Sequence, residues 1–497
     1  MEPRRGAVAA GHGVTAEAAA QVLRDGGNAF DAAVAAIAAA CIAEPVFASP
    51  GGGGFVMALE AGAAEPVVID FFGQTPRSGP DPDGSEFVSV FADFGPARQE
   101  FHIGHGATAV PGFLPGLAAV HERLCTAPLA DLIGPAIAAA RTGVAVTPFQ
   151  ASLFAVVRPI VTFSTGARSV FAPGGDLLAA GDRFLNPQLA DLFEAFGRQG
   201  PAFWAGAGSE ALVAGQAASG HVRADDIAGY RVENRRPLET ALADATAFLN
   251  PPPSAGGAMV AAMALILEAE GLDPAGAMAL ADEARLSHGG DPGRLLDALG
   301  IAWAGGHPDV PAPPAARGTT HVSVIDADGN AAAATVTNGE GNGHWVDGFG
   351  FMPNNLLGEA DLMPGGYHRW APDVRLASMM APTILRTPDD GVTALGSGGS
   401  SRIRSAIFQT LVRLVLDGLA PADAVAAPRI HIEDGHLDFE DLIDAAARDR
   451  LTGAFPGHRA WPERSFYFGG VHMVARTAGS AFSGAGDPRR AGVYLEV

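Results

Sequence analysis

The segment Gly318-Thr319-Thr320 holds residue types that suit self-cleavage followed by acyl transfer. If the peptide bond before Thr319 breaks, Thr319 gains a free α-amine beside its own hydroxyl. An α-amine has a reference pKa of roughly 7.7–8.0, which suits a general base that acts near neutral pH. One residue would then supply both the nucleophile and the base of an amidase.

Self-cleavage requires the hydroxyl of Thr319 to attack the carbonyl carbon of Gly318 and form an ester, which water then hydrolyses. Gly318 has no side chain to obstruct that carbonyl, and it tolerates a strained backbone. On its own, the tripeptide is more typical of an ordinary strand start. Cleavage between Gly318 and Thr319 is therefore predicted only with support from the rest of the chain.

The elements around Thr319 are predicted to be a linker and a buried hairpin. Residues 309–317 are rich in proline and alanine, which favours an exposed linker. Residues 321–325 alternate with the period of a strand, residues 326–330 form a turn, and residues 331–337 return as a second strand. A loose linker that runs straight into a buried strand is a suitable place for a processing site.

The first part of the chain alternates helices and strands. The apolar spacing predicts helices over residues 16–25, 31–43, 111–123 and 129–140. The glycine run 51–54 is predicted to be a loop before a strand at 55–59, and residues 150–310 are helix-rich.

The composition excludes several classes of function. The chain has 497 residues, 48% of them hydrophobic, and a net charge of −22. Such a charge repels phosphate backbones and anionic lipid, so we expect no nucleic-acid or membrane partner. All 32 basic residues are arginine. The absence of lysine excludes a P-loop lysine, a Schiff-base lysine and a Ser–Lys dyad.

Export, disulfide and zinc signals are also weak. Residues 32–43 are apolar but too short to span a bilayer. The first residues lack an apolar core followed by a cleavage site, so a cytoplasmic location is expected. Cys41 and Cys125 are too few for a disulfide framework or a CxxC zinc site.

Sequence blocks along most of the chain resemble the γ-glutamyltranspeptidase family. They occur in that family's order and include the segment around Thr319. The blocks are 26–34 (GGNAFDAAV), 44–45 (EP), 51–55 (GGGGF), 109–112 (AVPG), 251–257 (PPPSAGG), 318–326 (GTTHVSVID), 328–330 (DGN), 380–383 (MAPT) and 396–402 (GSGGSSR).

The resemblance implies an α+β fold, which is a four-layer αββα sandwich of the N-terminal-nucleophile hydrolases with helical additions. It implies that one precursor is processed into a large subunit, residues 1–318, and a small subunit, residues 319–497, which together form one domain. It also implies amide chemistry without a metal or an organic cofactor. The expected partners are a small γ-glutamyl or related amide substrate and an acceptor, which is water or an amine such as an amino acid.

The resemblance assigns catalytic roles to four residues. Thr319 is the nucleophile, and Thr337 matches the threonine whose hydroxyl contacts the nucleophile's α-amine. The backbone amides of Gly399 and Ser400 match the oxyanion hole. Such donors typically change rates by about 10²–10³-fold.

The resemblance assigns substrate binding to three further residues. Glu359 aligns with an acidic residue that receives the α-ammonium of a glutamyl group. Ser378 aligns with one of two serines near the α-carboxylate. Asn338 lies one place away from an expected asparagine.

The substrate pocket departs from the family pattern. Phe72 stands where the family has the arginine that clamps the α-carboxylate, and phenylalanine cannot pair with an anion. Met379 replaces the second serine, and Leu356 replaces an amide residue of the ammonium site. Ser400 replaces a glycine. The missing positive charge has four candidate sources, which are Arg98, Arg375, Arg402 and Arg404.

Several functions remain open at this point. The leading hypothesis is a γ-glutamyl hydrolase or transpeptidase that acts on glutathione-like compounds. The alternative is a related amidase for another acyl group, such as an oxamate-type monoamide or the glutaryl group of an acylated cephalosporin. A non-catalytic relative would remain uncleaved. A dinucleotide oxidoreductase is disfavoured because a strand follows the glycine run 51–54, where such a site needs a helix.

Other motifs have structural interpretations that we favour. The segment 326–330 resembles part of a calcium loop but lacks its distant glutamate, so it is predicted to be a β-turn. His321 lies on the Thr319 side of its strand, where packing is favoured over catalysis. An acidic cluster is predicted to be an exposed strand and turn rather than a metal site; it comprises His431, Glu433, Asp434, His436, Asp438 and Asp441.

Overall fold

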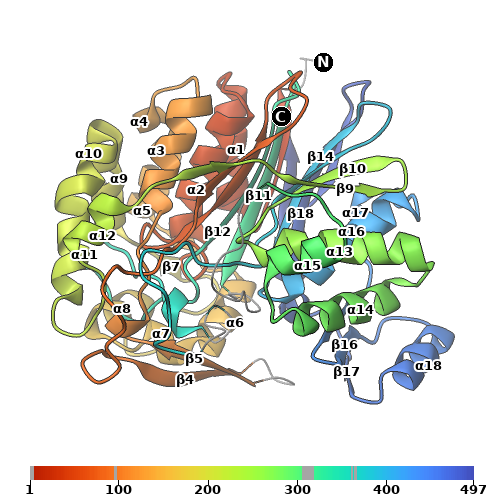
Figure 1. Cartoon of the computed structure of the whole chain (residues 1–497). Helices are drawn as coiled ribbons and strands as arrows, with labels where there is room; N and C mark the ends of the chain where they lie inside the picture. The colour runs from red at the N-terminus through yellow and green to blue at the C-terminus, as the bar shows by residue number, and fades with distance from the viewer. Residues whose placement is uncertain (1–4, 94–97, 305–317, 360–361, 363–365) are drawn as a thin grey trace.

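Two antiparallel sheets packed face to face form the centre of the fold (Figure 1). The structure is a computed structural model that describes residues 5–93, 98–304, 318–359, 362 and 366–497. The first sheet has the strand order β20 (Val493–Glu496), β1 (Gly6–Ala10), β11 (Thr319–Asp326), β12 (Ala331–Thr337), β2 (Gly53–Leu59), β3 (Val67–Phe71) and β8 (Glu233–Arg235). The second has the order β19 (Phe482–Ala485), β18 (Gly470–Arg476), β14 (Val392–Gly398), β13 (Thr383–Arg386), β10 (Ala245–Leu249) and β9 (Leu238–Leu242).

The predicted hairpin occupies the centre of the first sheet. β11 and β12 pair in antiparallel register, with Thr319 opposite Thr337. Val322 and Val324 of β11 pack into the core beneath the helices, whereas Ile325 packs into the core between the sheets. This alternation follows from the period of a strand. Both sheets combine strands from before residue 318 and after residue 319, so the two segments interleave.

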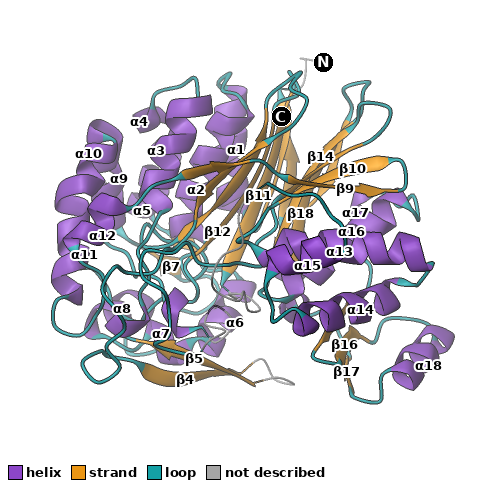
Figure 2. Ribbon diagram, in the orientation of Figure 1, coloured by secondary structure: helices purple, strands orange, loops and turns teal. Residues whose placement is uncertain are grey.

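Helices cover the outer face of each sheet, which completes four layers (Figure 2). α1 (Gly13–Arg24) and α2 (Ala29–Ala43) pack on the first sheet, and α13 (Ala255–Glu270), α16 (Arg402–Val415) and α17 (Pro421–Ala426) pack on the second. α2 is buried along its whole length. Asn28 and Asp31 form a capping box, so the helix begins two residues before the predicted start. The predicted αββα architecture is confirmed.

Further helices and three small sheets surround this sandwich. The additional helices are α3 (Phe113–Leu124), α4 (Leu129–Leu132), α5 (Gly134–Thr142), α6 (Pro148–Val156), α7 (Arg158–Val161), α8 (Thr165–Phe171), α9 (Pro187–Gln199), α10 (Pro201–Phe203), α11 (Ser209–Gln216), α12 (Ala224–Gly229), α14 (Pro274–Ser287), α15 (Pro292–Ala298) and α18 (Ala445–Ala454). The small sheets contain β4 (Val88–Asp93) and β5 (Arg98–Ile103), β6 (Val144–Ala145) and β7 (Arg183–Phe184), and β15 (Ile430–Glu433), β16 (His436–Glu440) and β17 (His458–Trp461). Among the described helices, none combines the length and apolarity needed to cross a membrane.

Two predicted elements differ from the observed ones. The helix predicted over residues 129–140 is two helices, α4 and α5, because Pro135 lies in the first turn of α5 and cannot donate a hydrogen bond to the preceding turn. The glycine run is not a loop throughout, since β2 already begins at Gly53. The linker predicted at 309–317 lies outside the described residues.

Candidate active site

Thr319 lies at the buried start of β11, next to the last residue of β12. Its side chain is wholly buried, and alternation along β11 directs it toward the second sheet, as for Ile325. Its Oγ1 atom makes no hydrogen bond to any part of the chain that the structure describes. A buried hydroxyl without a partner is unfavourable for stability alone. This hydroxyl is therefore a candidate reactive group.

The carbonyl oxygen of Gly318 is held by the hydroxyl of Thr337, which donates a short hydrogen bond to it. The same hydroxyl accepts a hydrogen bond of 3.0 Å from the backbone N–H of Gly339. A Cβ atom on residue 318 would lie 1.6 Å from the carbonyl oxygen of Gly339. Glycine is thus required at 318 because another backbone segment approaches closely, a reason that the sequence did not reveal.

The turn between β14 and α16 lies against the backbone of Thr319. A Cβ atom on Gly398 would lie 2.0 Å from the Thr319 carbonyl oxygen. Gly399 and Ser400 follow with φ angles of +124° and +63°. Successive backbone N–H groups of a turn can form a concavity that binds an anion. The predicted oxyanion residues are therefore brought next to the predicted nucleophile.

Two buried charged residues that sequence reasoning missed hold Thr319 and Thr320. Arg490 donates a 2.8 Å hydrogen bond from Nη1 to the Thr319 carbonyl, and Thr320 donates a 2.6 Å bond to Glu44. Burial, opposed by the charges of Asp487 and Glu44, lowers the pKa of Arg490 to about 10. Burial raises the pKa of Glu44 despite its hydrogen bonds from Thr320 and Thr15. Glu44 belongs to one of the sequence blocks that resemble the family, but that resemblance did not indicate its role.

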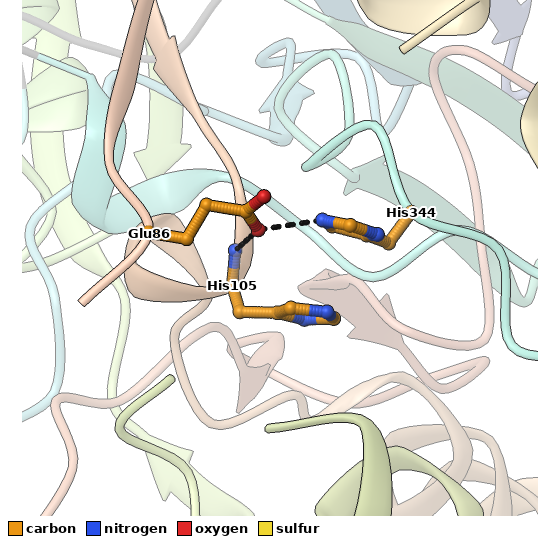
Figure 3. Close-up of side chains that lie close together, drawn as sticks. All are labelled: Glu86, His105 and His344. Atoms are coloured by element: carbon orange, nitrogen blue, oxygen red, sulfur yellow. Dashed lines mark hydrogen bonds and ion pairs between the residues drawn. The ribbon is translucent and has the colours of Figure 1, made fainter. Parts of the chain in front are cut away.

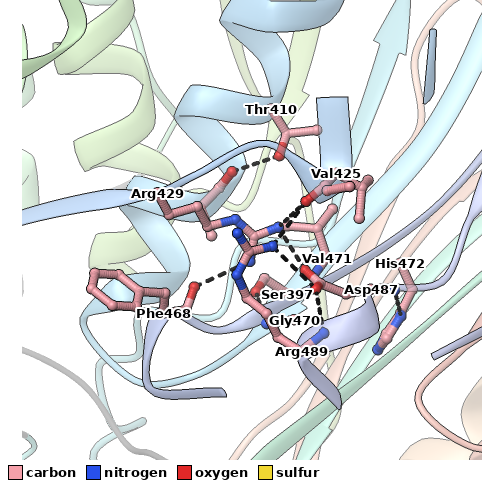
Figure 4. Close-up of polar contacts among 12 residues, drawn as sticks. Ser397, Thr410, Val425, Arg429, Phe468, Gly470, Val471, His472, Asp487 and Arg489 are labelled. Atoms are coloured by element: carbon pink, nitrogen blue, oxygen red, sulfur yellow. Dashed lines mark hydrogen bonds and ion pairs between the residues drawn. The ribbon is translucent and has the colours of Figure 1, made fainter. Parts of the chain in front are cut away.

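A buried ionic network next to Arg490 fixes the strand that flanks the oxyanion turn (Figure 4). Asp487 accepts hydrogen bonds from Arg429 at 2.6 Å, from the N–H of Val471 at 2.8 Å and from the N–H of Arg489 at 2.9 Å. Burial alone would raise the pKa of Asp487, but Arg429, Arg489 and the backbone donors outweigh it and lower this pKa. Because Val471 pairs with β14 just before Gly398, the network supports the turn.

The predicted substrate residues are only partly brought together. Glu359 is buried, and a Cβ atom on Gly339 would lie 2.5 Å from its carboxylate, so it lies near the segment that contacts Gly318. Asn338 is buried and donates a hydrogen bond of 3.1 Å to the carbonyl of Met352. The carbonyl of Ser378 instead accepts a 2.7 Å bond from Ser254, in the turn before α13.

The three substituted positions of the pocket share one apolar cluster. Phe72, Leu356 and Met379 are wholly buried members of the core between the sheets and under α13. Phe72 stacks on Phe55 with ring centroids 5.6 Å apart. Leu356 packs against Gly73, where a Cβ atom would lie 2.6 Å from the leucine side chain. These side chains offer apolar surface in place of the polar groups of the family pattern.

Arg375 is the one of the four candidate arginines that contacts Phe72. It donates to the Phe72 carbonyl, to the hydroxyl of Tyr230 at 2.5 Å and to the Arg231 carbonyl at 2.5 Å, and its Nε lies 3.6 Å from Asp70. Both of its terminal nitrogens therefore already donate to the protein and its charge lies beside that of Asp70, while Nε makes no hydrogen bond to the described residues. The others have different neighbours: Arg98 packs on the Phe91 ring, Arg402 on the Tyr467 ring, and Arg404 pairs with Asp282.

The remaining motifs have structural roles. His321 is wholly buried and bonds to Thr335 at 2.8 Å and to Ser323 at 2.9 Å, as expected of a packing role. Asp326 accepts the N–H groups of the predicted turn. The acidic cluster does form a strand and turn, but two of its members are buried rather than exposed: His431 contacts Ser405 and Glu433, and Asp438 accepts bonds from Arg459, Trp461 and Tyr467.

Comparisons with known proteins agree with this arrangement. The Gamma-glutamyltranspeptidase family profile matches residues 15–288 and 301–497. The "Acylase ACY 1 proenzyme" of Pseudomonas sp. (strain V22) is 30% identical, with 99% of this chain and 94% of that protein covered. The "Glutathione hydrolase proenzyme" of Bacillus subtilis (strain 168) is 28% identical, with 99% and 91% covered. The crystal structure of cephalosporin acylase from Bacillus halodurans shares the fold, with a TM-score of 0.82 at 20% identity and 99% and 96% covered. The chain belongs to the γ-glutamyltranspeptidase family of hydrolases and transpeptidases.

Proposed function

We propose that the chain cleaves itself between Gly318 and Thr319 and then acts as an amidase whose nucleophile is Thr319. The observation that carries this proposal is the buried pair formed by the Thr319 hydroxyl, which has no partner among the described residues, and the Gly318 carbonyl, which Thr337 holds. Cleavage would give fragments 1–318 and 319–497. Because both sheets combine strands from both fragments, the fragments would stay associated.

In the cleavage step, Oγ1 of Thr319 attacks the carbonyl carbon of Gly318. The carbonyl oxygen becomes negative and is stabilised by the Thr337 hydroxyl, which already donates to it. The C–N bond to Thr319 breaks as its nitrogen takes up the proton that the hydroxyl has lost, leaving the Gly318 acyl group as an ester on Oγ1. Water hydrolyses this ester, which frees the Gly318 carboxylate and the Thr319 α-amine.

In turnover, the freed α-amine accepts the proton of the Thr319 hydroxyl as it attacks the substrate amide. The N–H groups of Gly399 and Ser400 stabilise the tetrahedral oxyanion, and the leaving amine departs with a proton from the α-ammonium. The acyl-enzyme then passes its acyl group to water or to an acceptor amine. Thr337 lies opposite Thr319 in the β11–β12 pair, where its hydroxyl can bond to the new amine.

We further propose that the preferred acyl group lacks an α-carboxylate. Phe72, Leu356 and Met379 place apolar surface where the family pattern has polar groups. An anion next to such surface loses hydration without gaining a partner, which is strongly unfavourable. The neighbouring Arg375 does not compensate, because its guanidinium is bound to the protein and to Asp70.

A γ-glutamyl donor is the second candidate, and the position of Glu359 favours it. This buried carboxylate packs against Gly339, whose carbonyl oxygen lies against Gly318. An acidic group at that place suits the ammonium group of a glutamyl donor. Glu359 would also repel an acyl chain that ends in a carboxylate and carries no amine.

Four matched anilides separate these donors. γ-Glutamyl anilide has both the amine and the carboxylate, 4-aminobutyryl anilide lacks the carboxylate, glutaryl anilide lacks the amine, and butyryl anilide lacks both. We expect higher kcat/KM for each carboxylate-free anilide than for its carboxylated counterpart, with Thr319→Ala as the inactive control. Preference for the two carboxylated anilides would reject the apolar acyl group. No turnover of any amide by cleaved protein would count against the amidase itself.

A further inference from the structure

Glu86, His105 and His344 form a cluster outside the contacts described for Thr319 (Figure 3). One potential ligand atom from each residue lies within 4.8 Å of the others, and all three side chains are half-buried. Glu86 precedes β4, His105 follows β5, and His344 lies in the loop after β12. Within the described ranges, no other trio of histidine, cysteine and carboxylate groups meets this distance.

Backbone and ring contacts hold the cluster in place. Oε2 of Glu86 lies 2.6 Å from Nε2 of His344 and accepts a 3.1 Å hydrogen bond from the N–H of His105. The two imidazole rings stack with centroids 3.8 Å apart and planes within 11°. Asn342 accepts the N–H of His344 at 2.9 Å, and Phe163 packs edge-on against its ring at 5.4 Å. These contacts hold the three side chains next to one another.

An ion pair between Glu86 and His344 explains only part of this arrangement. It does not involve the ring of His105, which lies parallel to that of His344 and whose Nδ1 lies 3.2 Å from Nε2 of Gln216. Two protonated imidazoles at this separation would repel each other. Two neutral imidazoles and a carboxylate, in contrast, are a common donor set for a transition metal such as zinc.

We propose that Glu86, His105 and His344 bind one divalent transition-metal ion of the zinc class. Ligand atoms that share a zinc ion lie about 3–3.5 Å apart for bonds of about 2.0–2.2 Å. Because each imidazole binds a metal in the plane of its ring, one of the two rings must rotate out of the stack to bind the same ion. The sequence contains no sign of this site, because the three ligands come from distant segments and match no ligand-spacing motif. The three residues lie far apart in the sequence and come together only in the fold.

The ion would tie together parts of the chain that the proposed cleavage separates. Glu86 and His105 precede residue 318, whereas His344 follows it. The loop that carries His344 begins at the end of β12, close to Gly339, and the N–H of Gly104 already binds it at the carbonyl of Asn342, at 2.8 Å. This tethering rests on the proposed cleavage, but binding of the ion does not.

The test is direct titration of chelator-treated, tag-free protein with Zn²⁺ by calorimetry, with the bound metal counted by mass spectrometry after gel filtration. We expect one ion per chain. His105→Phe keeps an aromatic ring for stacking but removes a ligand. Mutation of a residue that only supports a ligand typically weakens metal binding by about 10–100-fold, so loss of the ligand itself should weaken Zn²⁺ binding by more than this. His458→Gln alters an exposed histidine on β17 and should bind as the parent does.

The uncleaved Thr319→Ala chain separates this proposal from the proposed function. It should bind one Zn²⁺ ion as the parent does, because the cluster does not depend on cleavage. In cleaved protein, Zn²⁺ should also raise the urea concentration at which the two fragments separate, and His105→Phe should abolish that increase. No stoichiometric ion in either form, or equal binding by His105→Phe and the parent, would overturn the site and leave an ordinary Glu–His ion pair.

Discussion

Replacing Thr337 with valine is the sharpest perturbation of the proposed cleavage step. Valine keeps the branched shape of threonine but removes the hydroxyl that donates to the Gly318 carbonyl and accepts from the N–H of Gly339. Loss of a donor to the developing oxyanion typically slows a reaction by about 10²–10³-fold. We therefore expect cleavage of Thr337→Val to slow by this factor.

The same substitution should lower stability by a separate amount. Two buried backbone groups lose a partner, and each such loss costs about 1–3 kcal/mol. The free energy of unfolding should fall by roughly 2–6 kcal/mol. This part is measured by urea unfolding of Thr319→Ala with and without Thr337→Val, since neither chain is expected to cleave.

The cleavage rate is measured by cell-free synthesis followed by gel analysis at successive times. Thr337→Ser is the matched control, because serine restores a hydroxyl and should recover most of the rate. Circular dichroism at each time point shows whether the valine chain is folded. Folded Thr337→Val that cleaves as fast as the parent would refute the assigned role of this hydroxyl.

Three other substitutions test other parts of the account. Gly318→Ala would place Cβ 1.6 Å from the Gly339 carbonyl oxygen, so gels should show no fragments; normal cleavage would contradict this packing. Phe72→Arg should raise kcat/KM for γ-glutamyl anilide relative to 4-aminobutyryl anilide by about 10–100-fold, because a hydrogen bond to a charged group contributes about 1.5–3 kcal/mol. An unchanged ratio would show that residue 72 does not contact the acyl group. The lowered pKa of Asp487 means that its stabilisation is present above the unfolded value of about 3.9 and is lost as pH falls through the folded value. In Asp487→Asn, the free energy of unfolding in urea should therefore change less with pH across that acid range than it does in the parent. At neutral pH it should be lower by about 3–5 kcal/mol, because Arg429 loses its charged partner. The same pH dependence in the variant and the parent would contradict this assignment.

Local patterns predicted the elements that carry the site. The alternation of residues 321–325, the turn and the return strand predicted β11 and β12, because side-chain period and turn chemistry act over a few residues. The apolar run after residue 31 predicted α2 for the same reason. The split between α4 and α5 was missed because Pro135 was read as part of a continuous helix.

Contacts between distant segments were beyond these patterns. Arg490 binds the Thr319 carbonyl across 171 positions, and nothing in the local sequence pairs them. The close approach of Gly339 to Gly318 depends on how the loop after β12 folds back. Phe72 was recognised only as a departure from a family pattern. Its place in an apolar cluster followed from the packing of three separate segments.

Intact-mass spectrometry of purified, active protein tests the central claim most directly. The account predicts two masses, which correspond to residues 1–318 and 319–497, with threonine at the start of the smaller fragment. It also predicts a single full-length mass for Thr319→Ala. Active protein in which residues 318 and 319 remain joined would contradict it.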